Sequence, residues 1–383
     1  MTRHRLRSTA FAAALTTLAS ASMLPAQTTV TVPPIDFSGV IYSNYQYRTD
    51  SRAKDFNKFD VERVYLTFRM PAGERASIRA TTDLYQQQNS PNDAYYAGWT
   101  IRLKYAYLQY NYITGKATDL TAVARVGMLH TMLIDHEENF WPRWISQTDV
   151  ERAGLFSSAD AGVATQITLP NKWGEIYGAV TNGPGYGSRE LDRFKDPQIR
   201  LTLTPLASSG AKLLSTWAIS PWYYKGLVAS RFVASAPPPA TNGPVGNGLK
   251  RDRWGIFTGI RDPRLALGAQ YAQFSGEGET GTNTGASPRV VADTTGHVVS
   301  AFAVVKPLAL FDTASSRFGL VARYDKVTTN TNTDAAYHVF IAGLIFDLSK
   351  RASISFDYQE QLSDKSTPTP PLKTYFAHVV ANF

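Results

Sequence analysis

The sequence predicts an all-β protein: a transmembrane antiparallel β-barrel of about 16 strands, with short turns at one end and long loops at the other. Three observations support this fold class. Stretches that alternate apolar and polar residues recur at the length of a membrane strand, about 9–11 residues. The connections between these stretches alternate between short and long. The chain also ends at Phe383, on the apolar face of such a stretch.

The alternation is clearest in two neighbouring stretches near the start of the chain. Residues 61–70, VERVYLTFRM, place apolar side chains on one face and Arg63 and Arg69 on the other. After the tight PAGE turn, residues 75–85 alternate in the same way, with Asp83 on the polar face. Successive side chains of a strand point to opposite faces, so both stretches have one apolar face. We therefore predict that they form a hairpin.

The connections set the predicted topology. Short connections such as PAGE and LSKR alternate with long ones such as RTDSRAKDFNK and the segment at about residues 130–160. Two of them break the rhythm, because KPLALFDTASS is long for a turn and TTNTNT is short for a loop. Outer-membrane barrels have short periplasmic turns and long extracellular loops. With an even number of strands the last strand can pair with the first, which leaves no exposed sheet edge.

The first 26 residues predict a secretory signal peptide that is cleaved from the mature chain. They combine a basic start, an apolar stretch and small residues before the expected cleavage site. The apolar stretch is shorter than the roughly 18 residues of a membrane helix. We expect residues 27–383 to form a single barrel domain in the outer membrane of a Gram-negative-type bacterium. The alternative is a cytoplasmic protein whose first residues form an amphipathic helix.

Composition agrees with a barrel. The chain has no cysteine, so disulfides do not stabilise it. Hydrophobic residues make up 43% of the chain, yet the mean hydropathy is slightly negative at −0.22. Only alternate residues of a membrane strand face lipid, which explains this combination. The net charge of +8 falls with removal of the signal peptide, and the remaining mild excess does not indicate nucleic-acid binding. A secreted all-β protein remains the alternative.

The last predicted strand, residues 374–383, carries Tyr375 and Phe383 on its apolar face. Aromatic rings are favourable where lipid meets water, and we expect such an outer girdle from Trp99, Tyr107, Tyr324, Tyr358, Tyr375 and Phe383. The strand closely resembles the C-terminal assembly signal of outer-membrane proteins, which ends in Phe. This resemblance implies that the barrel assembly machinery binds the strand, and that lipid and lipopolysaccharide surround the barrel.

Taken together, these features resemble the phosphate-selective porin O/P-like family of outer-membrane porins. The resemblance is carried by FDVERVYLTFRMPAGERASIRATTDLY, by KYAYLQY followed by ARVGMLH, and by GLFSSADAGVATQITLPNKWGEIYGAVTNGPGY. It implies a homotrimer and a third loop, at about residues 130–160, that folds into the barrel and constricts the pore. The family's cluster of loop lysines has no counterpart in this chain.

Strand parity predicts a basic lumen. The inward basic residues are Arg63, Arg69, Arg79, Arg102, Lys104, Arg125, Arg200 and Arg323, against Asp83, Asp325 and Asp357. Guanidinium groups suit phosphate and carboxylate oxygens, so such a lumen favours anions. We expect a passive channel for small hydrophilic solutes with a preference for phosphate-like anions. The alternatives are arginines that only pair with the aspartates, which leaves diffusion unselective, and a barrel that is mainly a structural or adhesive surface protein.

Charges of both signs in the third loop predict a constriction. Its candidate residues are Asp135, Glu137, Glu138, Arg143 and Arg152. The stretch HEENF lacks a second histidine at zinc spacing, so we expect an ion-paired loop without metal; a weak calcium site is the alternative. No G-x-S-x-G motif is present and no histidine lies beside a nucleophile in sequence. We therefore expect neither enzyme activity nor a cofactor.

Overall fold

The computed structural model describes residues 34–86, 98–115, 119–190, 192–228, 248–280, 290–311, 317–364 and 370–383. The predicted signal peptide, residues 1–26, lies outside these ranges. From Ile35 to Phe383 the chain forms one compact unit. Within the ranges described, no helix is long and apolar enough to cross a membrane.

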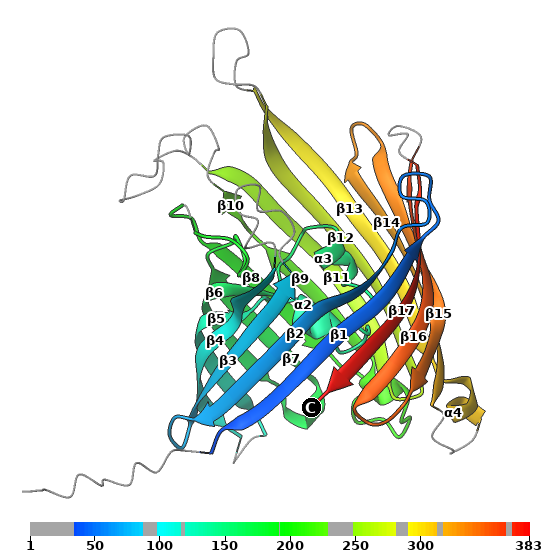
Figure 1. Cartoon of the computed structure of the whole chain (residues 1–383). Helices are drawn as coiled ribbons and strands as arrows, with labels where there is room; N and C mark the ends of the chain where they lie inside the picture. The colour runs from blue at the N-terminus through cyan, green and yellow to red at the C-terminus, as the bar shows by residue number, and fades with distance from the viewer. Residues whose placement is uncertain are drawn as a thin grey trace, which may run out of the picture. The chain divides into compact units, whose positions relative to one another are not determined.

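Sixteen antiparallel strands close into a barrel, which confirms the predicted fold class (Figure 1). They are β1 (Asp36–Arg48), β2 (Asn57–Pro71), β3 (Ala76–Gln86), β4 (Trp99–Thr114), β5 (Thr121–His130), β6 (Ala159–Thr168), β7 (Gly174–Thr181), β8 (Asp196–Leu203), β9 (Ala218–Tyr224), β11 (Leu249–Asp262), β12 (Leu265–Thr280), β13 (Val290–Val305), β14 (Phe318–Asn330), β15 (Ala335–Asp347), β16 (Ala352–Ser363) and β17 (Leu372–Asn382). Closure comes from pairing of β17 with β1, where Tyr45 lies opposite Ala377. The two-residue β10 (Leu227–Val228) pairs with β11 and is not one of the sixteen.

Helices are few and short. Two of them, α2 (Ile134–Glu137) and α3 (Asp149–Arg152), lie between β5 and β6. The others lie in connections: α4 (Pro307–Phe311) between β13 and β14, and the 3-10 turns η1 (Pro170–Lys172) and η2 (Leu214–Thr216). The C-terminus and α4 lie at one end of the barrel, which we call the short-turn end (Figure 1).

Side chains alternate between the two faces of the barrel wall as the sequence predicts. In β2, Tyr65 and Thr67 are buried inside while Phe68 is exposed outside. Phe383 also lies on the outer face, where its ring is 5.9 Å from that of Phe37. The ring covers Gly39 so closely that a Cβ there would come within 2.3 Å of it. The terminal aromatic residue is therefore part of the seam that closes the barrel.

A β-bulge in β4 changes this alternation. Thr81 of β3 pairs with Tyr105 and Thr82 pairs with Leu103, so Lys104 is an extra residue. Lys104 and Tyr105 consequently both face inward and are 5% and 3% exposed. Beyond the bulge the parity is reversed. The prediction that Tyr107 belongs to the outer girdle is therefore wrong: Tyr107 is buried, with its hydroxyl 3.3 Å from Nε2 of His130.

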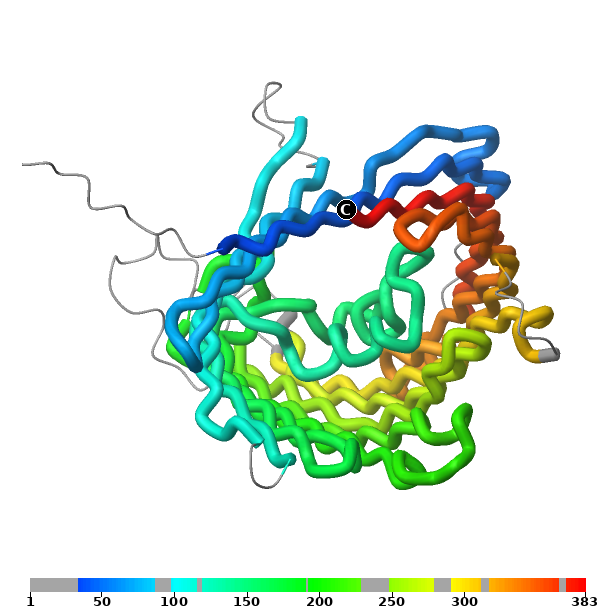
Figure 2. The backbone as a smooth tube through the Cα atoms, turned by 90° about the horizontal axis from the view of Figure 1, so that it is seen from below, coloured from blue at the N-terminus to red at the C-terminus, as the bar shows by residue number. Residues whose placement is uncertain are grey.

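The third loop, residues 131–158 between β5 and β6, lies inside the barrel (Figure 2). Its apolar side chains pack on the inner wall. They form clusters with inward residues of β4 to β7, β9 and β11 to β15; from the loop these include Met132, Leu133, Ile134, Phe140, Trp141, Ile145 and Val150, and from β11 to β15 Phe257, Ala272, Val298, Val321, Val327, Val339, Ile341 and Ile345. Strand parity predicts a lumen with polar walls, but here part of the interior is an apolar core under the loop.

Candidate functional site

Polar and aromatic side chains line the inner wall formed by β2 to β4, next to the apolar core. Asp83, which is fully buried, binds Arg63 at 2.9 Å and Arg102 at 2.8 Å. The Arg102 guanidinium lies 4.1 Å from the ring centre of Tyr85 and 4.3 Å from that of Tyr186. The Tyr186 hydroxyl donates a hydrogen bond to the same carboxylate. Both arginines are thus held in place and share one counter-charge.

Lys104 lies next to this group and has no such counter-charge. Its ammonium is 4.2 Å from the ring centre of Tyr65 and 5.3 Å from that of Tyr105. The guanidinium of Arg79 also lies over the Tyr105 ring, 4.4 Å from its centre. Its Nη1 lies 2.9 Å from Nε2 of His130. Aromatic faces attract cations but carry no net charge. Within the described residues, neither of these two cations pairs directly with a carboxylate.

Two more of the predicted arginines, Arg69 and Arg125, lie on the inner wall nearer the short-turn end. Arg69 is exposed, lies on the same face of β2 as Tyr65, and is opposite Arg79 in the strand register. Arg125 donates hydrogen bonds to the amide oxygens of Gln109 and Gln166 at 2.9 and 3.0 Å. We call Arg69, Arg79, Lys104 and Arg125 the cation row. Within the described residues, no carboxylate oxygen lies within 4.0 Å of a cationic nitrogen of these four side chains.

Arg200 and Arg323 also face inward, but the third loop covers them. Arg323 is 2% exposed, bonds Asp325 at 2.8 and 2.6 Å, and donates to the carbonyl oxygen of Gln147 at 2.5 Å. Arg200 pairs with Glu175 and donates to the carbonyl oxygen of Met132. Each therefore joins the wall to the loop and is neutralised by a carboxylate.

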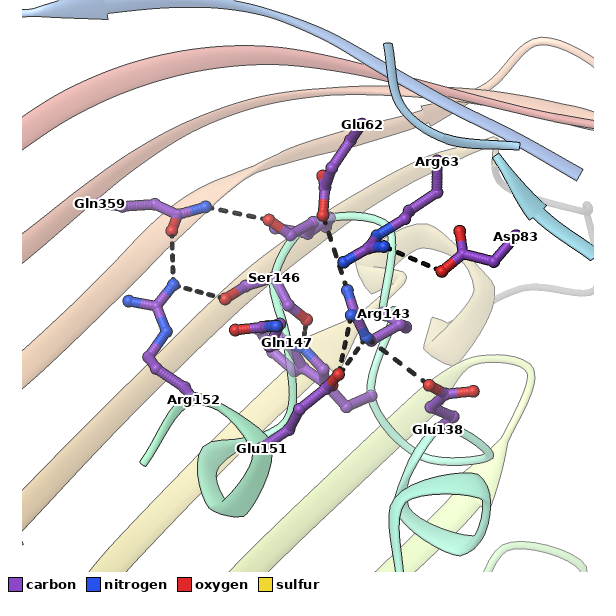
Figure 3. Close-up of polar contacts among 12 residues, drawn as sticks. Glu62, Arg63, Asp83, Glu138, Arg143, Ser146, Gln147, Glu151, Arg152 and Gln359 are labelled. Atoms are coloured by element: carbon purple, nitrogen blue, oxygen red, sulfur yellow. Dashed lines mark hydrogen bonds and ion pairs between the residues drawn. The ribbon is translucent and has the colours of Figure 1, made fainter. Parts of the chain in front are cut away.

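The charged loop residues gather around Arg143, which is 7% exposed (Figure 3). Its Nε lies 2.9 Å from Glu151 and 3.6 Å from Glu138, and its Nη1 lies 3.7 Å from Glu62 of β2. Arg152 is apart from these acids: it donates to Oγ of Ser146 at 2.6 Å and to Oε1 of Gln359 at 3.0 Å. Burial without a carboxylate partner lowers the pKa of Arg152 to about 10.

Asp135 occupies the end of the loop that meets the cation row. It accepts a hydrogen bond from the Tyr105 hydroxyl at 2.7 Å and pairs with His130. Although burial opposes ionisation, His130 and Lys104 hold the pKa of Asp135 below its usual range. Across the described residues, no three His, Asp or Glu side chains are grouped to hold a metal ion.

Glu137 and Asp149 form a buried acid pair between the two loop helices. Glu137 is 2% exposed, and neither of its carboxylate oxygens has a hydrogen-bond partner among the described residues. Burial, followed by the charge of Asp149, raises the pKa of Glu137 well above its usual value. Burial likewise raises the pKa of Asp149 to about 7, against the attraction of Arg323. Protonation of the pair therefore stabilises the packed loop.

This pair predicts pH-dependent stability. Because both pKa values are raised on folding, the folded chain binds more protons than the unfolded chain, and stability falls as pH rises from about 4 to about 7. Glu137→Gln should therefore raise the melting temperature of the refolded barrel more at pH above 7 than below 4. Glu62→Gln, which changes a half-exposed carboxylate, is the control. If Glu137→Gln changed the melting temperature equally at both pH values, the raised pKa of Glu137 in the folded barrel would be contradicted.

No family profile matches the sequence, and no curated protein matches it significantly. Solved structures do match. The anion-selective porin from Comamonas acidovorans aligns over 92% of this chain and 100% of its own length, at a TM-score of 0.60 and 10% identity. The fold is that of the outer-membrane porins. The outer membrane channel DcaP of Acinetobacter baumannii aligns over 92% and 98% (TM-score 0.60, 11% identity), and the trimer form of Vibrio cholerae OmpT over 92% and 100% (0.55, 9%). At these identities the porin fold is shown, and the phosphate-selective family is not confirmed.

Within this porin fold, sequence reasoning missed much of the inner wall. Strand parity places Tyr65 and Tyr85 on the inward face with Arg63 and Asp83, although the sequence gives them no role. Sequence reasoning did not identify the inner tyrosines Tyr105 and Tyr186, nor the acids Glu62, Asp149 and Glu151. Tyr105 could not be found from strand parity, because the bulge at Lys104 turns it inward.

Proposed function

We propose that this chain is an outer-membrane porin: a passive diffusion channel, without enzyme activity, for small hydrophilic solutes with a preference for phosphate-like anions. The porin fold and the apolar outer face support a place in the outer membrane of a Gram-negative-type bacterium. The observation that carries the anion preference is the cation row, whose four members lack a nearby carboxylate in the described part of the chain.

The physical reason is the weak screening of charges in a narrow passage. Side-chain charges on the wall of a water-filled pore raise the local concentration of ions of opposite sign. Arg63 and Arg102 add little, because Asp83 already neutralises them in part. Lys104 and Arg79 add most, because in the described residues their contacts are with aromatic rings, a histidine and the Thr81 hydroxyl, none of which is a carboxylate. Phosphate and carboxylate oxygens are the groups that such cations bind.

The proposal includes the partners of the barrel. Tyr375 and Phe383 on β17 would be bound by the barrel assembly machinery, and lipid and lipopolysaccharide would cover the outer face. Assembly as a homotrimer is supported by the likeness to a protein solved in a trimer form. The third loop, with Asp135, Glu137, Glu138, Arg143 and Arg152, would form the constriction.

The test is ion conduction by the purified protein, refolded and inserted into planar bilayers. We expect stepwise ohmic conductance, and a reversal potential across a KCl gradient that shows chloride to be more permeant than potassium. A cation-selective reversal potential would overturn the anion preference and leave the channel intact. Silence of a correctly folded, heat-modifiable barrel would overturn the channel itself and favour a structural or adhesive surface protein.

A further inference from the structure

The acids around Arg143 outnumber the charges that can neutralise them. Glu62, Glu138 and Glu151 all approach this one guanidinium, at 3.7, 3.6 and 2.9 Å (Figure 3). Glu151 takes the best position, with a second hydrogen bond from Nη2 at 3.1 Å. If all three carboxylates were ionised, the group would carry an excess negative charge in a place with little water. Such a cluster binds a proton readily.

Glu138 is the member least able to stay ionised. The Glu62 side chain is 35% exposed and therefore hydrated, and Glu151 has the closest contacts with Arg143. Oε1 of Glu138 is fully enclosed, has no hydrogen-bond partner in the ranges that the structure describes, and lies 3.6 Å from Arg143, farther than the 2.9 Å of Glu151. A buried carboxylate oxygen without a donor is costly when charged. The proton should therefore reside on Glu138.

Glu138 lies 3.6 Å from Arg143 and also interacts electrostatically with Lys104 of the cation row. The charged and titratable groups that face it from the surrounding elements are Tyr42 of β1, Glu62 and Tyr65 of β2, Lys104 and Tyr105 of β4, Asp135 of α2, Arg143 of the loop and Glu151 of α3. Among these, Lys104 is the one cation that no carboxylate approaches within 4.0 Å in the described chain. Lys104 interacts electrostatically with the carboxyl groups of both Asp135 and Glu138, so ionisation of Glu138 adds a second negative charge near Lys104.

We propose that Glu138 is a proton-dependent selectivity residue of the constriction: protonated, it leaves Lys104 free to attract anions, and ionised, it compensates Lys104 and weakens the anion preference. This inference rests on the proposed porin function and specifies how the same site is regulated. It assigns the control of selectivity to an acid on the loop, opposite the basic wall.

The pH range follows from the surroundings of the carboxyl group. Burial raises the pKa of Glu138 to about 7; Lys104 and Arg143 act against this rise, and the charges of Asp135 and Glu151 add to it. Glu138 is thus protonated in mildly acidic solution and ionised in mildly alkaline solution. The anion preference should be strong below about pH 7 and weaker above it.

The test is the reversal potential of single channels across a KCl gradient, measured from acidic to alkaline pH. For the wild-type protein we expect the chloride-to-potassium permeability ratio to fall roughly twofold to fivefold as pH rises, because one unit charge appears beside the passage. Glu138→Gln should keep the acidic value of the ratio at every pH. Glu62→Gln, the matched control at the same arginine, should keep the pH step.

The outcomes separate the inference from the proposed function. A wild-type channel that prefers anions equally at every pH overturns the role of Glu138 and leaves the proposed porin function intact. This measurement uses the wild-type protein alone. The pH step could also persist in the Glu138→Gln variant, in protein that shows the normal heat-modifiable shift of a folded barrel. Another group would then cause the step, and the role of Glu138 would be overturned. Absence of any conductance overturns the proposed function, and the inference with it.

Discussion

Replacing Lys104 by glutamine is expected to lower the chloride-to-potassium permeability ratio about fivefold, which corresponds to roughly 1 kcal/mol of electrostatic energy for an ion in the constriction. Lys104 contributes a full charge, and in the part of the chain that the structure describes its ammonium lies over the rings of Tyr65 and Tyr105 without a carboxylate within 4.0 Å. Glutamine keeps most of the side-chain length and removes that charge. The measurement is the reversal potential at acidic pH, where Glu138 is protonated and the preference is largest.

Lys250→Gln is the matched control for this charge change. Lys250 lies at the start of β11, its side chain is 56% exposed, and its ammonium is 3.8 Å from Asp252. Removing its charge should leave the permeability ratio unchanged. If both variants change the ratio equally, net charge and not the position of Lys104 determines selectivity. If neither does, another part of the channel determines it.

The sequence predicts the wall of this barrel better than its interior. Parity is a local property, so the inward positions of Arg63, Asp83 and Arg323 could be read from single strands. A bulge depends on how two strands pair, and nothing in the letters around Lys104 marks the extra residue. The reversed parity of Tyr107 could therefore not be predicted.

Which basic residues keep a free charge depends on contacts between segments distant in sequence. Arg102 and Lys104 are two positions apart on the same strand and look equivalent in the sequence. Asp83 of β3 pairs with Arg102 and no carboxylate pairs with Lys104 within the described ranges. Likewise, Arg323 becomes buried only because the third loop covers it. The predicted basic lumen thus separates into the four residues of the cation row, two arginines that pair with Asp83 and two arginines that anchor the loop.

Contacts between distant segments also explain the apolar core under the third loop. The run of Met132, Leu133 and Ile134 is apolar, and inward positions of β13 to β15 such as Val298 and Ile341 are apolar as well. Neither the apolar run in the loop nor the apolar positions of the wall, taken alone, predicts where the loop lies in the barrel. Together they show that the loop needs an apolar surface to bury its own side chains, and that the wall supplies one. These apolar contacts therefore hold the loop against the inner wall.

Arg323→Met is expected to lower the free energy of unfolding by about 3–5 kcal/mol, because it leaves Asp325 buried and unpaired. The side chains of both partners are 1% exposed, and Arg323 also binds the third loop through Gln147. Methionine retains an unbranched apolar stem like the aliphatic part of arginine, so that part of the packing is kept while the charge is removed. Denaturant unfolding of the refolded barrel, followed by its β-sheet signal, gives the free energy.

The chain contains a control with the same local geometry and different burial. Arg264 binds Asp262, also two residues away, through Nε at 2.7 Å and Nη2 at 3.0 Å, much as Arg323 binds Asp325 at 2.8 and 2.6 Å. The Arg264 side chain is 40% exposed at a turn, so water replaces the lost partner, and Arg264→Met should leave stability nearly unchanged. Equal losses in the two variants would show that the pair geometry matters and the burial under the loop does not.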